Sequence, residues 1–139
     1  MSSALLFLEE KKLVHQDVKP GNILINKDGL MKLCDFDACD DLFTMKLEAT
    51  VNDSISSRGE RRFLRGTTAY LAPYPEPCST DGDKWALGLV AVVIINGKHP
   101  FAELVETGKQ ELIPFKFRGW KPEFQRTIWN NLKKLIEDL

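Results

Sequence analysis

The apolar residues near the start of the chain recur at the spacing of a helix. Between residues 3 and 12 they fall on roughly one face, and a charged run of two glutamates and two lysines closes the segment. The members of this face are Ala4, Leu5, Leu8 and Leu13. The pattern predicts an amphipathic helix over 3–12.

Two short apolar segments follow, separated by a polar turn. Residues 23–26 and 30–34 contain branched apolar side chains, and the turn between them ends in Asp28-Gly29, a pair typical of hairpins. We therefore expect a β-hairpin. The three consecutive branched residues at 23–25 indicate that its first strand is buried.

A longer apolar segment lies near the middle of the chain. Residues 85–95 are apolar on every side of a helical projection, so we expect a helix over about 80–96 that is buried all round. Ser79 or Thr80 can cap its start, and nearby aspartates suit the positive end of the helix dipole. The apolar run is too short to cross a bilayer.

The last third of the chain has a weaker pattern. It predicts a short helix over 103–110, then a loop, and then a final helix over about 122–138 that Pro122 opens. We interpret Trp120 and Trp129 as packing residues rather than as binding residues.

Composition narrows the class of protein. The chain has 139 residues, of which 43% are hydrophobic, and its net charge of −1 gives no bulk attraction to nucleic acid or anionic membrane. Its three cysteines, Cys34, Cys39 and Cys78, lack metal-ligand spacing and fit reduced thiols. No signal peptide is evident at the N-terminus. We therefore expect an intracellular protein, cytoplasmic or nuclear, with no nucleic-acid or membrane partner.

The most distinctive chemistry lies in residues 14–25, which read VHQDVKPGNILI. The carboxylate of Asp17 can orient an attacking hydroxyl group and accept its proton. The cation of Lys19 can neutralise charge on a moving phosphoryl group, and the amide oxygen of Asn22 can bind magnesium. For this stretch alone, the alternative is a surface loop whose polar side chains are merely solvated.

The order of these residues resembles the catalytic loop of the eukaryotic-type protein kinase family, written H-R-D-x-K-x-x-N. The resemblance implies that residues 13–25 are the catalytic loop and that Asp17 and Lys19 are catalytic. It also implies that Lys19, Asn22 and Leu24 bind the cofactor, with Leu24 against the adenine ring.

A second motif stands at residues 35–37, where the family has Asp-Phe-Gly and this chain has Asp-Phe-Asp. The resemblance implies that Asp35 binds the cofactor and, together with Asn22, its magnesium ion. Asp35 follows Asp17 by eighteen positions, which suits two strands and one turn bringing both carboxylates to one cleft. Asp37 in place of glycine indicates altered mobility of the loop.

The segment 38–76 resembles the activation segment of a kinase. Residues 42–65 show no hydrophobic period, and residues 66–73 read GTTAYLAP, similar to the family's G-T-x-x-Y-x-A-P. Thr67 takes by resemblance the place of a threonine that hydrogen-bonds the catalytic Asp and Lys in serine/threonine-specific members. The family's Arg beside the catalytic Asp is Gln16 here, so we expect no standard phosphate switch.

Three further residues have structural roles by the same resemblance. His15 packs in a hydrophobic stack with Phe36, and Asp83 at the start of the central helix accepts hydrogen bonds from the catalytic-loop backbone. The matching motifs, in the family's order, cover nearly the whole chain. They imply a mainly α (α+β) fold that is the C-terminal lobe of a kinase, with a short β-hairpin near the catalytic loop.

The family's glycine-rich loop and V-A-I-K lysine find no match before Ala4, so we expect the N-terminal lobe to be absent. The chain then encodes ATP- and Mg²⁺-dependent phosphate transfer to Ser/Thr, but without that lobe we expect it to bind nucleotide weakly and to be inactive or weakly active alone. Three hypotheses stay open: part of a serine/threonine kinase, a pseudokinase or mimic that regulates a true kinase or its substrate, and a lobe completed by another polypeptide. The partners are a protein substrate, a partner kinase, or a second copy associating through apolar surface that the absent lobe leaves bare.

Overall fold

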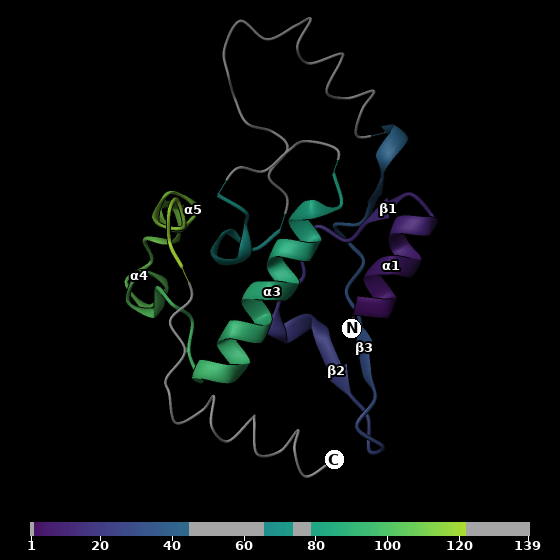
Figure 1. Cartoon of the computed structure of the whole chain (residues 1–139), viewed down its shortest axis with the longest axis horizontal. Coiled ribbons are helices and arrows are strands. Elements are labelled where there is room, and N and C mark those ends of the chain that lie inside the picture. The colour runs from purple at the N-terminus through teal and green to yellow at the C-terminus, as the bar shows by residue number, and fades with distance from the viewer. Residues whose placement is uncertain (1, 45–65, 74–78, 122–139) are drawn as a thin grey trace, which may run out of the picture.

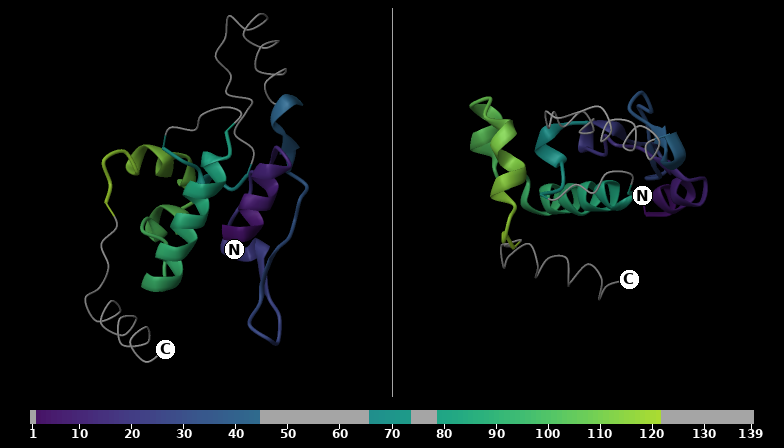
Figure 2. Two further views of the ribbon diagram at one scale, coloured as in Figure 1. Left: turned by 45° about the vertical axis from the view of Figure 1, so that its right-hand side comes forward. Right: turned by 90° about the horizontal axis from the view of Figure 1, so that it is seen from above.

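A central helix organises the fold. The structure is a computed structural model that describes residues 2–44, 66–73 and 79–121. The helix α3 spans Asp81–Asn96, close to the predicted 80–96, and ends at Gly97 in the left-handed conformation that glycine adopts without strain. The helix α1 (Ser2–Glu10) lies on one side of α3, whereas α4 (Ala102–Glu106) and α5 (Ile113–Lys116) lie on the other (Figure 1). Further views of the molecule show the same arrangement (Figure 2).

The central helix is not buried all round, so this prediction was wrong. Its buried apolar residues, Ala86, Leu89, Val90 and Val92, face the two neighbouring layers, whereas the side chain of Ile94 is 67% exposed. Gly88 and Ala91 are also exposed and lie on the same side as Ile94. Gly88 and Ala91 are small and lose little by exposure, and single large apolar residues such as Ile94 also occur on protein surfaces, so the hydrophobic pattern overestimated burial here.

Two hydrophobic clusters occupy the two sides of α3. The first joins α1 to α3 and to the catalytic loop, and consists of Leu5, Leu8, Val18, Ala86 and Val90. The second joins α3 to α5 and to the short 3₁₀ helix η2 (Thr68–Tyr70), and consists of Ala69, Leu89, Val92, Ile113 and Phe117. The helix therefore fixes residues 13–25 and the segment after residue 66 against one another.

The strands form two separate two-stranded antiparallel sheets. The predicted hairpin is present as β2 (Ile23–Ile25) and β3 (Met31–Leu33), and 3₁₀ helix η1 (Pro20–Asn22) precedes it. Its first strand is not buried as predicted, because Leu24 and Ile25 are 56% and 68% exposed. The sheet has only two strands and projects away from α3, so nothing covers this face among the described residues (Figure 1).

The second sheet was not predicted. Strand β1 (Leu13–Val14) pairs with β4 (Asp40–Asp41), with Leu13 opposite Asp41 and Val14 opposite Asp40. Each strand has two residues, too short to carry a period, and the pairing joins segments far apart in the sequence. It attaches the segment after residue 35 to the segment that leads into the catalytic loop.

The predicted loop after residue 110 is also wrong. Residues 110–112 form the 3₁₀ helix η3 (Gln110–Leu112), and α5 follows directly. Ile113 and Phe117 are buried in the second cluster, and Phe117 contacts the rings of Phe101 and Trp120 edge-on. The two helical pieces have only three and four residues, which is too short to show a helical period.

Several predicted elements lie outside the described residues. They are most of the activation segment, at 45–65 and 74–76, the final helix over about 122–138, and Trp129. Within the part of the chain that the structure describes, no helix has both the length and the apolar character needed to span a membrane.

Candidate active site

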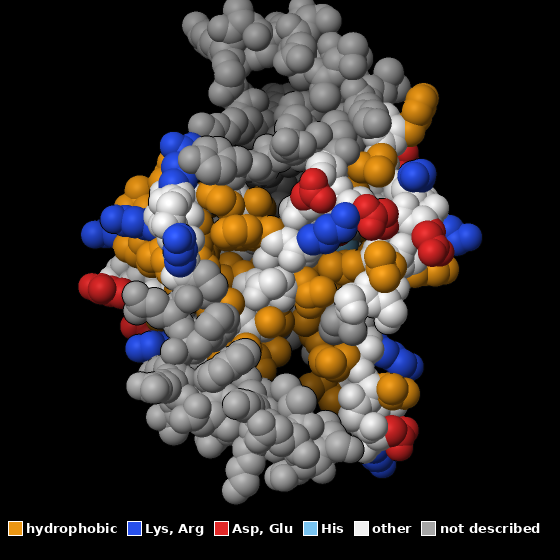
Figure 3. All heavy atoms as spheres, viewed as in Figure 1, with side chains coloured by type: hydrophobic (Ala, Val, Ile, Leu, Met, Phe, Trp, Pro, Cys, Tyr) orange, Lys and Arg blue, Asp and Glu red, His pale blue; other side chains and the backbone are white. Residues whose placement is uncertain are grey.

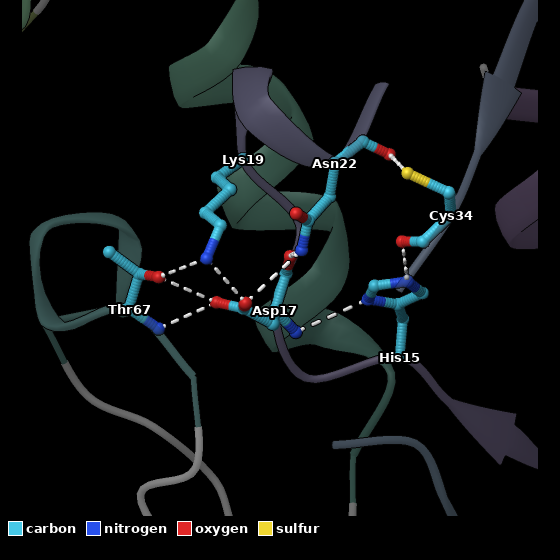
Figure 4. Close-up of polar contacts among 6 residues, drawn as sticks. All are labelled: His15, Asp17, Lys19, Asn22, Cys34 and Thr67. Atoms are coloured by element: carbon cyan, nitrogen blue, oxygen red, sulfur yellow. Dashed lines mark hydrogen bonds and ion pairs between the residues drawn. The ribbon is translucent and has the colours of Figure 1, made fainter. Parts of the chain in front are cut away.

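Asp17 is the centre of the candidate site, and each of its carboxylate oxygens accepts two hydrogen bonds. Oδ1 accepts from the backbone N–H and the hydroxyl group of Thr67, both at 2.7 Å. Oδ2 accepts from Lys19 Nζ at 2.7 Å and from Asn22 Nδ2 at 3.1 Å. Figure 4 shows the three donor residues converging on this carboxylate.

The protons in this cluster have one consistent assignment. The Lys19 ammonium group can only donate, so the Thr67 hydroxyl, 3.0 Å away, accepts from it and donates its own proton to Asp17. Partial burial tends to raise the pKa of Asp17, but the hydrogen bonds from Lys19 and Thr67 outweigh it and lower that pKa. The carboxylate is therefore ionised, oriented and half-shielded from water.

Asn22 lies beside this carboxylate with its amide orientation fixed. Its Nδ2 group donates to both the backbone carbonyl and the carboxylate of Asp17, at 2.9 and 3.1 Å. Among the residues that the structure describes, nothing donates to Oδ1 of Asn22. An amide oxygen without a partner, next to a carboxylate, is the type of ligand that magnesium takes. The residue present at this position therefore fits a magnesium ion.

Asp35 is placed next to Asn22 through the backbone. The N–H of Cys34 donates to the carbonyl of Asn22 at 2.9 Å, which extends the β2–β3 ladder by one pair, and the Cys34 thiol donates to the same oxygen. Asp35 itself has a left-handed backbone with φ of 65° and an exposed side chain. Its carboxylate has no hydrogen-bond partner in the described part of the chain, and it fits a metal ligand by donor type.

His15 joins the candidate catalytic loop at residues 13–25 to the candidate metal motif at residues 35–37. The ring is fully buried, and its Nε2 atom lies 3.1 Å from the carbonyl of Cys34. Its Nδ1 atom accepts from the N–H of Asp17 at 3.3 Å, so Nε2 carries the proton and donates to Cys34. Phe36 packs edge-on against the ring at 4.9 Å between centroids. The imidazole thus has a structural position, with neither nitrogen available as a base.

Asp83 holds the backbone of the catalytic loop in place from α3. Its buried carboxylate accepts hydrogen bonds from the N–H groups of His15 and Gln16, at 2.7 and 2.9 Å. Burial raises the pKa of Asp83, and the two backbone hydrogen bonds oppose that effect. Gln16 has a left-handed φ of 67°, a conformation that costs about 1 kcal/mol outside glycine.

Gly66 allows the segment that carries Thr67 to approach the loop that carries Asp17. Its φ is 95°, and a Cβ atom built on it would lie 2.0 Å from the carbonyl oxygen of Gln16. Only glycine tolerates both the positive φ and the close approach of the carbonyl oxygen, so Gly66 lets Thr67 reach Asp17. A glycine immediately before the threonine was the available sequence signal, but the sequence analysis assigned it no role.

The structure thus brings four of the predicted site residues into one hydrogen-bonded cluster: Asp17, Lys19, Asn22 and Thr67. His15, Phe36 and Asp83 lie beside it in the contacts given above. Leu24 and Asp35 are exposed and make no side-chain hydrogen bond to this cluster. Sequence reasoning missed Cys34, whose backbone supports the metal motif.

Comparison with known proteins identifies the family to which the chain belongs. The family model of the protein kinase domain matches residues 1–139. MAP kinase kinase MKK1/SSP32 of Saccharomyces cerevisiae is 34% identical over 119 residues, which cover 84% of this chain and 20% of that protein. An Aurora kinase of Candida glabrata is 31% identical over 142 residues, covering all of this chain and 35% of that protein.

A serine/threonine-protein kinase of Schizosaccharomyces pombe, ppk24, is 35% identical over 108 residues and covers 75% of this chain and 22% of its own length. The chain belongs to the protein kinase domain family. It spans between about a fifth and just over a third of the length of these relatives.

Proposed function

We propose that the chain forms the catalytic-loop side, the C-terminal lobe, of a protein serine/threonine kinase site. The reaction is ATP- and Mg²⁺-dependent phosphoryl transfer to a Ser or Thr hydroxyl of a protein substrate. The observation that carries the proposal is the Asp17 carboxylate, ionised and held by four hydrogen bonds from Lys19, Thr67 and Asn22.

The role of each residue follows from its contacts. Asp17 orients the substrate hydroxyl through a carboxylate oxygen and accepts its proton. Lys19 places a positive charge 2.7 Å from that carboxylate, where charge on the transferred group is neutralised. Thr67 ties the segment that carries it to both residues. Asn22 and Asp35 supply oxygen ligands to Mg²⁺, and Leu24 offers exposed apolar surface to the adenine ring.

Mg-ATP, when bound, supplies the phosphoryl group together with the cation that screens its charge. Catalysis of this kind depends on positioning and charge, so the preorganised Asp17 cluster favours an enzyme over a mimic that only binds. A pseudokinase or mimic acting on a partner kinase is the second candidate, and Asp37 in place of the motif's glycine favours it.

Two measurements test the proposal. Mg-ATP should raise the melting temperature of the chain, Asp35→Ala should abolish the shift, and Asp28→Ala, which removes an exposed carboxylate at the hairpin turn, should leave it intact. Phosphate incorporation into Ser/Thr peptides should fall about 10²- to 10⁴-fold in Asp17→Asn. A thermal shift that persists in Asp35→Ala, or measurable incorporation that is equal in both chains, contradicts the kinase assignment. No incorporation in either chain leaves the pseudokinase or mimic and an inactive part of a kinase.

A further inference from the structure

Gln16 lies where four segments meet, and within the described part of the chain its side chain bonds to one of them. Its backbone N–H donates to Asp83 in α3, and its carbonyl oxygen lies against Gly66. The next residue along the chain is Asp17. The side-chain amide points elsewhere: Nε2 donates to the carbonyl of Ala38 at 2.9 Å.

The bond to Ala38 holds a turn that overlaps the motif at residues 35–37. Cys39 N–H donates to the carbonyl of Phe36 at 3.0 Å, so residues 36–39 form a tight turn. The turn is anchored before Asp35 by Cys34 and after residue 39 by the β1–β4 ladder. Between these anchors, the amide of Gln16 is the polar side chain that holds the backbone of the turn.

We propose that Gln16 is a positioning residue that fixes Asp35 beside Asn22 by holding the turn at 36–39. The inference rests on the proposed function, because positioning matters only if Asp35 binds the metal. A neutral amide donates to a neutral carbonyl here, so the contact needs no negatively charged partner. The metal motif is therefore held in place without a phosphate group on the chain.

The backbone of Gln16 supports this assignment. A left-handed φ of 67° in a residue other than glycine persists only where the surroundings determine it. Asp83 holds the N–H of Gln16, and Gly66 leaves room for its carbonyl group. With both backbone groups fixed, the side chain leaves the loop on the side of Ala38. Sequence comparison with the family motif shows only that a charge is missing at this position.

The test compares Gln16→Met, which keeps the length of the side chain but removes the donor, with Gln16→Arg, which keeps a donor. Gln110→Met is the matched control, because it makes the same change in η3. All chains are treated with phosphatase first. Hydrogen exchange is followed at the amides of residues 36–41 and, for comparison, at Val90 in α3. The Mg²⁺ concentration that half-saturates the ATP-induced thermal shift is measured in parallel.

We expect Gln16→Met to speed exchange at residues 36–41 by about tenfold, with Val90 unchanged, and to raise the half-saturating Mg²⁺ concentration several-fold. Gln16→Arg and Gln110→Met should behave as the wild type. Unchanged exchange in Gln16→Met overturns the inference, and so does faster exchange with an unchanged Mg²⁺ requirement. If the wild type and Asp35→Ala respond identically to Mg-ATP, the proposed function fails. The exchange data then still show whether the amide of Gln16 holds the turn at 36–39.

Discussion

Asp17 keeps its charge in a half-buried position because four donors surround its two oxygens. Of these, the Lys19 ammonium and the Thr67 hydroxyl also bond to each other, so the three side chains form a closed ring of hydrogen bonds. In such a ring each bond limits the freedom of the others. The geometry at Asp17 therefore depends on a threonine fifty positions away in the sequence.

We predict that Thr67→Val raises the pKa of Asp17. The variant removes the hydroxyl donor, which is one of the causes that hold this pKa below its ordinary value near 3.8. A lowered carboxylate pKa stabilises the fold above about pH 3.8, and this stabilisation is lost as pH falls through the folded-state pKa. The pKa can be followed by NMR titration of the Asp17 carboxyl carbon.

Thr107→Val is the control for this experiment. Thr107 directly follows α4, and its hydroxyl group donates to the backbone carbonyl of Glu103 within that helix. The same chemical change there should leave the pKa of Asp17 as it is in the wild type. If the pKa of Asp17 is unchanged in Thr67→Val, then the Lys19 ammonium group and the backbone N–H group of Thr67 are enough to keep that pKa low.

The sequence was sufficient to predict which side chains gather around Asp17, because Asp17, Lys19, Asn22 and Thr67 are chemically distinctive and occur in a fixed order. It was not sufficient to find Cys34 and Gly66. Cys34 acts mainly through its backbone, and Gly66 acts by lacking a Cβ atom where a carbonyl group approaches. Neither role leaves a pattern of hydrophobic or charged residues that a sequence can show.

At the scale of elements, α3 is attached to its surroundings by polar contacts near its first turn. Lys84 bonds to Glu9 of α1 at 2.8 Å, and the Thr80 hydroxyl donates to the same carboxylate at 2.9 Å. In the space-filling view, acidic and basic side chains lie close together where α1 meets the start of α3 (Figure 3). The exposed pair contributes little to stability, whereas the buried Asp83 one turn away contributes more.

We predict that Asp83→Ala lowers the free energy of unfolding by about 3 kcal/mol. The variant leaves the N–H groups of His15 and Gln16 without their acceptor in a buried position. Because these groups define the start of the catalytic loop, phosphate incorporation should fall as well. Urea unfolding followed by circular dichroism measures the stability change.

The matched control is Asp81→Ala, which removes a carboxylate that is 71% exposed in the same helical turn. It should change the free energy of unfolding by less than about 1 kcal/mol, since its contact with Lys84 is a surface ion pair. Equal losses in the two variants would show that Asp83 acts only through the helix dipole and not through the loop backbone.

Among the elements, those with a local signal were predicted well. The hairpin has its Asp28-Gly29 turn, and α3 has a continuous apolar run, so their bounds could be placed within one or two residues. The β1–β4 pair and the helical pieces η3 and α5 had no such signal. They are stabilised by contacts with distant segments, and local sequence does not encode those contacts.

At the scale of the whole molecule, the two histidines of the chain connect distant segments in the same way. In each, Nδ1 accepts from the backbone N–H two residues later, so Nε2 carries the proton and donates to a distant carbonyl. His15 reaches Cys34 on the side of the first cluster, and His99 reaches Ala69 at 3.0 Å in the second. Both imidazoles are buried, and in each ring one nitrogen donates a hydrogen bond while the other accepts one.

We predict that His99 makes the stability of the molecule depend on pH. Burial is the main cause that lowers the pKa of His99 below its ordinary value near 6.5, and its two backbone contacts oppose the shift. Because the folded-state pKa is below the unfolded one, the unfolded chain binds the proton first. The stabilisation is present above about pH 6.5 and is lost as pH falls through the folded-state pKa.

The measurement is the free energy of unfolding at several values between pH 7.5 and pH 5.5, compared between the wild type and His99→Gln. The limiting slope for one proton is about 1.4 kcal/mol per pH unit. The wild type should approach that slope below pH 6.5, and the variant, which keeps an amide donor for Ala69 but cannot titrate, should show a smaller one. Since the absolute stability of His99→Gln is expected to be lower at every pH, only the difference in slope is diagnostic. Parallel curves would mean that protonated His99 is accommodated among Tyr70, Phe101 and Phe117 without opening the second cluster.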